Sequence, residues 1–311
     1  MSINLIGKYY ICFHKLSKTN EAKEPMPIEE FIIQIYCCID DYLKTTPKVR
    51  TRGPAPLLND AEVLTIEILA EIMGHGSDKG IFDYTHSHWR SWFPKLGTRT
   101  SLTRQMSNLW MIKEQVRNHL VKSICPDNDL FLFDGFPMPT CHPKRVRSNN
   151  PLRGEAGFGY CAAKDHHYFG FKGHVVTNTH GLILNFTFAA ANIDERDVLP
   201  ELVSSYQGTL IADKGLIRPS LTDELATHRL DLQTPLRSNM HDSRPKSFVN
   251  QLMNTRRLVE TVIGQLVDRF NVQKIRVKDV WHLMAKLSRK ILAHTAAFFI
   301  KKSLQFDQIF S

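Results

Sequence analysis

The chain has 311 residues, of which 42% are hydrophobic and 23% charged, and its formal net charge is +9. This is the composition of an ordinary globular protein of one or two domains, and the six cysteines, which form no C-x-x-C pair, argue against a disulfide framework or a zinc site and fit a reducing cytoplasm. No apolar run approaches the roughly 20 residues of a membrane span, so we expect no membrane partner, whereas the basic balance favours a polyanion such as nucleic acid over the alternative of a solvated charged surface.

The first part of the chain is expected to be helical behind a leader. Residues 1–26 close with the polar, proline-containing stretch TNEAKEPM, and we expect them to form a poorly ordered leader. Residues 27–125 are predicted to form an all-helical module of four or five helices, because apolar residues recur there at helical spacing. In the segment NDAEVLTIEILAEIMG, Asn59 and Glu62 have the spacing of a capping box, and Gly74 is a natural helix stop.

The second part, residues 126–311, is predicted to combine strands and helices. Stretches typical of strands are LFLFD, YFGFKGHVVTNT, LILNFTFAAAN, GTLIAD and LDLQTP, with a tight hairpin at residues 179–181 between the second and the third. Helical patterns cover DERDVLPELVSSY, RPSLTDELATH and the chain from about Phe248 to Leu304. Three consecutive strands followed by alternating helices and strands predict an α+β or α/β fold in which helices cover a mixed sheet.

Two of the predicted strands end in an aspartate, Asp134 in LFLFDGF and Asp213 in GTLIADKG. In open α/β sheets the ligand crevice lies outside the carboxyl ends of the strands, so neighbouring parallel strands would bring both carboxylates to one edge. Two unpaired carboxylates repel each other there, and a divalent cation that prefers oxygen ligands, Mg²⁺ or Mn²⁺, would relieve the repulsion. Taken alone, each aspartate is more typical of a turn.

A third carboxylate, Glu260, lies in the predicted helix NTRRLVETVIGQLVDRF. Apolar residues at intervals of three and four define the buried face of this helix, and Glu260 lies beside that face. Arg256 and Arg257 lie one turn before it, where they could hold DNA phosphates, or one of them could pair with a core acid such as Asp231. Gly264 lies one turn after it and suggests room for a close neighbour. Taken alone, Glu260 is typical of a solvated helix residue.

In combination these features resemble the DDE transposases of bacterial insertion sequences, whose catalytic domain has a ribonuclease-H-like fold. The resemblance is carried by the blocks DGFPMP, RGEAGFGYCAAK, YFGFKGHVV, AANIDERDVLPELV, ADKGLI, DLQTPLRSNM and RRLVETVIGQL, and in the helical part by RGPAPLLNDAEVLTIEI and HWRSWFPKLGTRT. It spans about residues 28–300. It implies a ribonuclease-H-like catalytic domain over residues 126–311, and a helical module over residues 27–125 that binds the transposon ends on its own.

The resemblance also implies the site and its cofactor. The catalytic residues and metal ligands would be the same three carboxylates, Asp134, Asp213 and Glu260, holding two ions of Mg²⁺ or Mn²⁺. Related families carry a tyrosine, an arginine and a lysine around the glutamate. Arg256 matches the arginine, but Met253 and Val267 stand in the other two positions, so the DNA contacts of that tyrosine and lysine do not carry over.

The implied function is that of a transposase, which cleaves the ends of an insertion sequence and joins the freed 3′-hydroxyls to target DNA. The partners would be the terminal inverted repeats and target DNA, on which the chain assembles as a homodimer, in the cytoplasm at the nucleoid. Two alternatives stay open: a nuclease of the same fold that cleaves without joining, and a non-catalytic DNA-binding protein derived from a transposase. The presence of all three carboxylates argues against the second.

Basic residues supply candidate phosphate contacts. Nine lysines and arginines stand against three acids between Arg256 and Lys290, so most of the net charge lies in this stretch. We expect DNA to contact Arg145, Arg147, Arg153, Lys172, Lys214, Arg237, Arg256, Arg257 and Lys274, with a solvated basic face as the alternative. The acids of DERD, residues 194–197, are expected to cap a helix, and His166 and His167 to lie in a surface loop.

Overall fold

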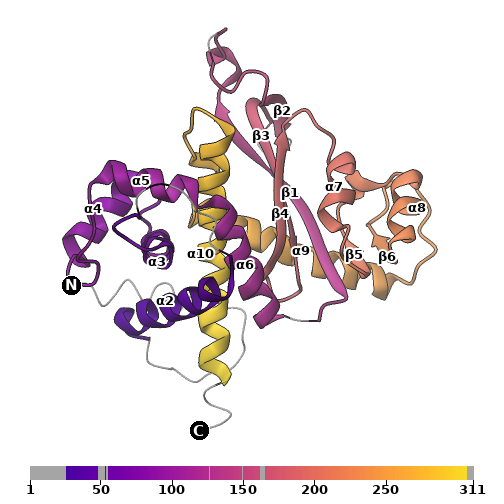
Figure 1. The fold of residues 1–311 in the computed structure, drawn as a ribbon. Coiled ribbons are helices and arrows are strands. Elements are labelled where there is room, and N and C mark those ends of the chain that lie inside the picture. Colours follow the sequence, from indigo (N-terminus) through magenta and orange to yellow (C-terminus); the bar gives the residue numbers. More distant parts are fainter. Residues whose placement is uncertain are drawn as a thin grey trace.

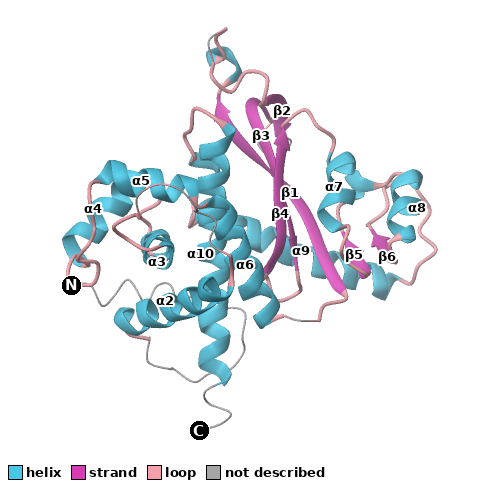
Figure 2. Ribbon diagram, in the orientation of Figure 1, coloured by secondary structure: helices cyan, strands magenta, loops and turns pink. Residues whose placement is uncertain are grey.

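Figure 1 shows the computed structural model of the chain, which describes residues 26–47, 53, 55–125, 127–148, 150–161 and 165–306. The expected leader lies outside these described residues, except for Met26. The sheet lies between the helices of the first part of the chain and the helices α7 and α8 of the second part (Figure 2). No helix in the described ranges is long and apolar enough to cross a membrane.

The first part of the described chain consists of helices, as expected. They are α2 (Ile28–Thr45), α3 (Asp60–Ile72), α4 (Asp78–His88), α5 (Arg99–Asn108) and α6 (Trp110–Ile124). The capping box at the start of α3 is confirmed, because the Asn59 side chain accepts a hydrogen bond from the Glu62 amide and the Asn59 amide donates one to the Glu62 carboxylate. Gly74, just after this helix, has a φ of +87°, a conformation that glycine adopts without strain where a helix ends.

The second part builds one six-stranded mixed sheet, which confirms the expected fold class. Its strands are β1 (Leu130–Cys141), β2 (Gly157–Cys161), β3 (His166–Thr177), β4 (Ile183–Ala190), β5 (Gly208–Ile211) and β6 (Leu230–Gln233). β1, β2 and β4 all pair antiparallel with β3, whereas β5 pairs parallel with β1 and β6 parallel with β5. The sheet therefore has an antiparallel half and a parallel half that meet at β1, the ribonuclease-H-like arrangement.

β1 is longer than the sequence suggests. The strand does not end at Asp134 but continues to Cys141, because Asp134 and Gly135 pair with Val175 and His174 of β3. A partner strand on this side satisfies the backbone groups that a turn would otherwise leave free, and so it overrides the turn preference of the Asp-Gly dipeptide.

β2 is a strand that the sequence does not predict, because glycines weaken the strand signal of GFGYC. One of these glycines is required by packing, since a Cβ on Gly159 would lie 2.8 Å from the ring of Tyr168. The partner of β2 also corrects a second expectation. His166 and His167 do not lie in a loop but begin β3, where they pair with Cys161 and Tyr160.

Helices cover both faces of the sheet: on one side α9 (Lys246–Asp268) and α10 (Val280–Phe306), on the other α7 (Glu195–Val203) and α8 (Pro219–Thr227). Leu132 of β1 and Ile211 of β5 belong to the core under α9 and α10. Phe131 and Phe133, whose side chains point the other way, belong to the core under α7 and α8. Because side chains alternate along β1, the position of a residue in the strand determines which face of the sheet its side chain lies on.

α10 also belongs to the core of the first part of the chain. Leu292, Ala296 and Ile300 of this helix are buried in the hydrophobic cluster built by α2 to α6. In Figure 1 the yellow α10 accordingly runs beside the indigo and purple helices. A division of the chain at residue 126 stays a prediction, and an isolated module of residues 27–125 would lack these three core side chains.

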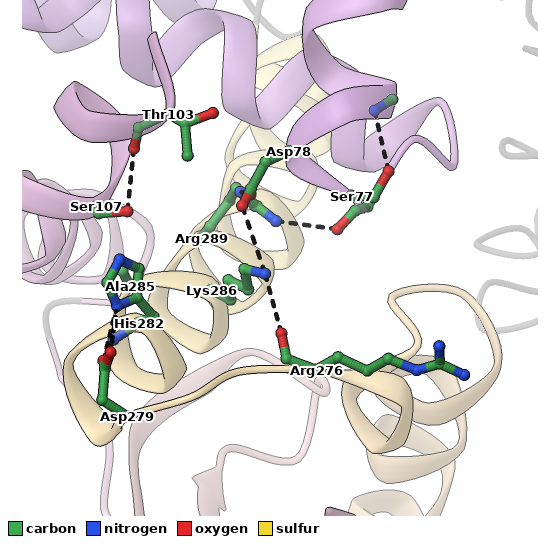
Figure 3. A network of polar contacts seen from close by, with 12 residues as sticks. Ser77, Asp78, Thr103, Ser107, Arg276, Asp279, His282, Ala285, Lys286 and Arg289 are labelled. Carbon is green, nitrogen blue, oxygen red and sulfur yellow. Dashed lines mark hydrogen bonds and ion pairs between the residues drawn. The ribbon is translucent and has the colours of Figure 1, made fainter. Parts of the chain in front are cut away.

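A buried network of ion pairs ties α10 to α3, α4 and α6. Arg289 Nε lies 2.7 Å from Glu71 Oε1 and Arg289 Nη1 lies 3.0 Å from Asp78 Oδ1, while Lys113 Nζ lies 2.7 Å from Glu67 Oε1. Figure 3 shows Asp78 between Arg289 and Lys286. Arg289 and Lys290 therefore contact buried acids, and the basic cluster expected to face DNA between residues 256 and 290 is smaller than its sequence suggests.

Candidate active site

The two aspartates occupy equivalent positions on neighbouring parallel strands. The parallel pairing of β1 with β5 ends where Leu132 lies opposite Ile211. Asp134 follows two residues later within β1, so its side chain points to the same face as Leu132, and Asp213 follows two residues after Ile211, just beyond β5. Asp134 thus lies on the face that α9 covers, and the ion pair of Asp213 with Arg256 of α9 brings the second carboxylate to the same side.

Glu260 reaches the same place through Arg256. Arg256 Nη2 lies 3.3 Å from Asp213 Oδ1, and Arg256 Nη1 lies 2.8 Å from Glu260 Oε1. The guanidinium therefore bridges two of the three predicted carboxylates. Its position is fixed by the apolar face of α9, where Val259, Val262 and Leu266 are buried against the sheet.

Asp134 is the carboxyl whose protonation the site perturbs most. Its pKa is raised from 3.8 to about 6, first by burial and further by the negative charges of Glu195 and Asp213. The Gly135 amide, which donates a hydrogen bond of 2.8 Å to Asp134 Oδ1, and the positive charge of Arg256 act in the opposite direction. Asp134 is thus a partly buried carboxyl in a region of excess negative charge, which a cation would stabilise in its ionised form.

The three carboxylates offer oxygen donors only, which suits Mg²⁺ or Mn²⁺. Within the described ranges, however, no three His, Cys, Asp or Glu side chains lie close enough to hold one ion together. Arg256 lies between Asp213 and Glu260 and pairs with both, so its single positive charge offsets part of their negative charge. The donor set therefore fits such an ion by its chemistry, once Arg256 releases at least one of these carboxylates.

Two expectations for α9 are corrected. An added Cβ on Gly264 would meet no atom within 4 Å, so this glycine does not make room for a close neighbour of Glu260. Arg256 does pair with acids, but with Asp213 and Glu260 rather than with Asp231. Asp231 instead accepts a hydrogen bond from Gln233 on the same strand.

Glu195 is a neighbour of the site that sequence reasoning missed. Its Oε1 lies 2.9 Å from Lys172 Nζ and would lie 3.0 Å from a Cβ added to Gly135, the residue after Asp134. The capping role expected for the DERD acids is confirmed for Asp194, whose side chain accepts a hydrogen bond from the Arg196 amide at the start of α7. Helix capping thus explains the first acid of this motif, whereas the second lies against β1.

The residues expected to contact DNA fall into two groups. Lys172 and Arg256 are held in ion pairs with Glu195 and with the site carboxylates. The other seven have exposed side chains: Arg145, Arg147, Arg153, Lys214, Arg237, Arg257 and Lys274. Lys214 and Arg257 follow Asp213 and Arg256 directly, so the exposed positive charge begins next to the carboxylates.

Comparison with known proteins finds a family match for the second part of the chain. Residues 126–280 match the protein-family model described as "Transposase DDE domain", and this match contains Asp134, Asp213 and Glu260. No curated protein matches the chain. Among solved structures, the chain is similar to a cryo-EM structure of the piggyBac transposase synaptic complex with hairpin DNA, at 12% identity and a TM-score of 0.46 over 95% of this chain and 75% of that one. By this match, the part of the chain from residue 126 to residue 280 is similar to transposase DDE domains.

Proposed function

We propose that the protein is a transposase that cleaves DNA at the ends of a mobile element and joins those ends to target DNA. The observation that supports this most is that Asp134 and Asp213 each lie two residues beyond the parallel pairing of β1 with β5, with Glu260 linked to Asp213 through Arg256. Neighbouring carboxylates at a strand edge, within a DDE domain, suit the transfer of phosphodiester bonds better than any acyl or redox chemistry.

The carboxylates have distinct tasks in this proposal. Asp134 lies on the strand shared by both halves of the sheet and would be the central ligand, while Asp213 and Glu260 flank it. Divalent ions held there, Mg²⁺ or Mn²⁺, would activate the attacking oxygen and neutralise the leaving oxygen. The site would hold a phosphodiester so that water attacks the phosphorus and the bond to the 3′-oxygen breaks. In a second round the freed 3′-hydroxyl attacks a phosphorus of target DNA, whose own 3′-oxygen leaves.

Arg256 would serve the free and the DNA-bound protein in different ways. In the free protein it pairs with Asp213 and Glu260 and reduces the repulsion between them. Cations held by these carboxylates would free the guanidinium to contact a phosphate next to the scissile one. Its planar fork can donate two hydrogen bonds to one phosphate, and the exposed Arg257 and Lys214 would extend the contact along the strand.

The helices α2 to α6 would bind the transposon ends, because the proposed chemistry is the same at every phosphodiester and selects no sequence by itself. Two copies of the chain, one on each end, would bring the two ends together as a homodimer on the DNA of the nucleoid. A nuclease that cleaves without joining is the alternative of the same class, and a non-catalytic DNA-binding protein is the other.

The test is cleavage and joining by the purified full chain with Mg²⁺, on a duplex that carries an inverted repeat flanking the gene. The wild-type protein should release a 3′-hydroxyl end and join it to a second duplex. Asp134→Asn should lower both rates at least about a thousandfold while DNA binding persists, since the variant lacks the central carboxylate. Asp129→Asn, an exposed carboxylate at the other end of β1, is the matched control and should act like wild type.

Each outcome separates the candidates. Cleavage without joining, even when the substrate already carries a free 3′-hydroxyl end, would identify the nuclease. Binding without either reaction in Mg²⁺ or Mn²⁺ would identify the non-catalytic protein. Cleavage by Asp134→Asn at the rate of Asp129→Asn would remove the carboxylate site from the mechanism altogether.

A further inference from the structure

One stretch of the helical part carries only positive charge. Residues 28–125 contain twelve lysines and arginines against eleven acids, so this part is nearly neutral as a whole. Between Asp83 and Glu114, however, the sequence has no Asp or Glu at all. In that interval the chain exposes four basic side chains, Arg90, Lys95, Arg99 and Arg104. The surface around α5 is therefore locally suited to a polyanion.

α5 itself has one buried face and one polar face. Leu102 and Met106 are buried in the core, and the Gln105 side chain is held by hydrogen bonds to the Leu58 carbonyl and Asp60. The opposite face carries only groups that can form hydrogen bonds, at positions that recur every four residues: Arg99, Thr100, Thr103, Arg104, Ser107 and Asn108. Among the described residues, Arg99 and Arg104 have no acid within 4.0 Å, so their guanidiniums are available to a ligand.

These six side chains form one wall of a surface cavity of about 420 Å³, and the first turn of α10 forms the other wall. Trp281 is 49% exposed there and packs edge-on against Trp110, with 5.7 Å between the ring centres. His282 is fixed by Asp279, whose carboxylate lies 2.7 Å from His282 Nδ1. Figure 3 shows Thr103 and Ser107 of α5 on the side of His282. The cavity thus lies between α5 of the first part of the chain and α10 of the second part.

We propose that the polar face of α5 lies in the major groove of duplex DNA and reads the sequence of the transposon end. The proposal rests on the proposed function and deepens it by naming the reading surface. The major groove admits one α-helix, and arginine and asparagine form paired hydrogen bonds with guanine and adenine there. Arg104 and Asn108, four residues apart, would contact base edges, while Arg99 and Thr100 at the start of the helix would contact a phosphate.

The cavity beside α5 gives the sugar–phosphate backbone of the same duplex a place. A helix that enters a groove needs room for the strands that border the groove, and the concave surface between the polar face of α5 and the first turn of α10 offers that room. Trp281 offers an apolar ring and an indole N–H to that backbone, and the basic loop that contains Arg276 and Lys278 immediately precedes it. An acidic protein partner would pair with the positive charges, but it would not explain the row of threonine, serine and asparagine side chains, which suit hydrogen bonds to base edges and phosphates.

The test is a binding measurement with the full-length chain, without divalent metal. Duplexes selected from a random pool by the wild-type protein serve as specific DNA, and shuffled versions of them serve as non-specific DNA. Arg104→Ala should weaken binding to the selected duplex about 5- to 150-fold and binding to the shuffled duplex far less. Arg104→Lys keeps the charge but loses the planar fork, so it should not restore the preference. Lys122→Ala removes one exposed charge from α6 and is the matched control.

Methylation of guanine at N7, in the major groove, should block wild-type binding at defined positions, and Arg104→Ala should lose at least one of them. Three results would overturn the proposal: no sequence preference in the selected pool, equal losses for Arg104→Ala and Lys122→Ala, or equal losses on selected and shuffled DNA. Binding to duplex RNA as tight as to DNA would also overturn it, because the narrow major groove of RNA excludes a helix. These are binding assays, so a protein that neither cuts nor joins DNA would refute the proposed function and leave this comparison intact.

Discussion

Asp134→Asn should stabilise the fold at neutral pH, although it removes a residue that the proposed chemistry requires. The Asp134 carboxyl has a pKa of about 6 in the folded chain against an ordinary 3.8, with burial as the largest cause. Each pH unit between these two pKa values corresponds to about 1.4 kcal/mol. Ionising this carboxyl at pH 7 therefore lowers the free energy of unfolding by about 3 kcal/mol. Asparagine is neutral at every pH, and its side-chain oxygen can keep the hydrogen bond from the Gly135 amide.

The pH dependence fixes the sign of this prediction. A carboxyl whose pKa rises on folding destabilises the protein progressively as the pH rises from the unfolded to the folded pKa, here from about 4 to about 6. Above that window the cost is constant. The advantage of Asp134→Asn over wild type should therefore be about 3 kcal/mol at pH 7 and only about 0.5 kcal/mol at pH 4.

Urea unfolding of both proteins at the two pH values, with a chelator present, measures the effect. Asp129→Asn, which alters an exposed carboxylate of the same strand region, should stay within about 0.5 kcal/mol of wild type at either pH. An Asp134→Asn variant that is no more stable than wild type at pH 7 would refute the reasoning. So would an advantage that persists undiminished at pH 4, because it could not come from ionisation of the carboxyl.

The ion pairs and α10 lead to three further expectations. Arg256→Ala should weaken binding of all DNA sequences alike, and the slope of the binding constant against salt concentration should become shallower by roughly one. An unchanged slope together with a lower unfolding temperature would mean that Arg256 only stabilises the carboxylates of the folded protein. Arg289→Met should lower the free energy of unfolding in urea by about 3–5 kcal/mol, because Glu71 and Asp78 lose a buried partner, and a loss below about 1 kcal/mol would contradict this. A fragment of residues 27–125 should show no cooperative thermal transition, since its core lacks the α10 side chains, whereas a sharp transition would prove the module independent.

Local patterns predict that Asp134 and Asp213 lie near each other, because each follows an apolar run typical of a buried strand. Their role as metal ligands stays a prediction. The continuation of β1 past Asp134 depends on the pairing of Gly135 with His174, a contact between residues far apart in the sequence. Local propensity contains no information about such a partner.

Charge could not be assigned to a surface or to the interior from sequence alone. Arg289 and Lys290 look like the other basic residues of their stretch, but they are buried against Glu71 from a helix more than two hundred residues away. Glu195 was likewise hidden, because its neighbour Asp194 has a sufficient local role as a cap. The interval without acids around Arg99 and Arg104 can be recognised from the sequence, but only when acidic residues are counted together with basic ones.

α10, the last helix among the described residues, completes the core that α2 to α6 build. During synthesis this core can therefore form only after α10 has been made. At the usual 5–20 residues per second, α2 to α6 leave the ribosome roughly 10–35 s before α10 does. Until then Leu292, Ala296 and Ile300 are missing from their core, and Glu71 has neither Arg289 nor Lys290. Chains released early by a premature stop would carry α5 without the helix that supports it. Under the proposed function, such incomplete products should bind transposon ends less tightly than finished copies do.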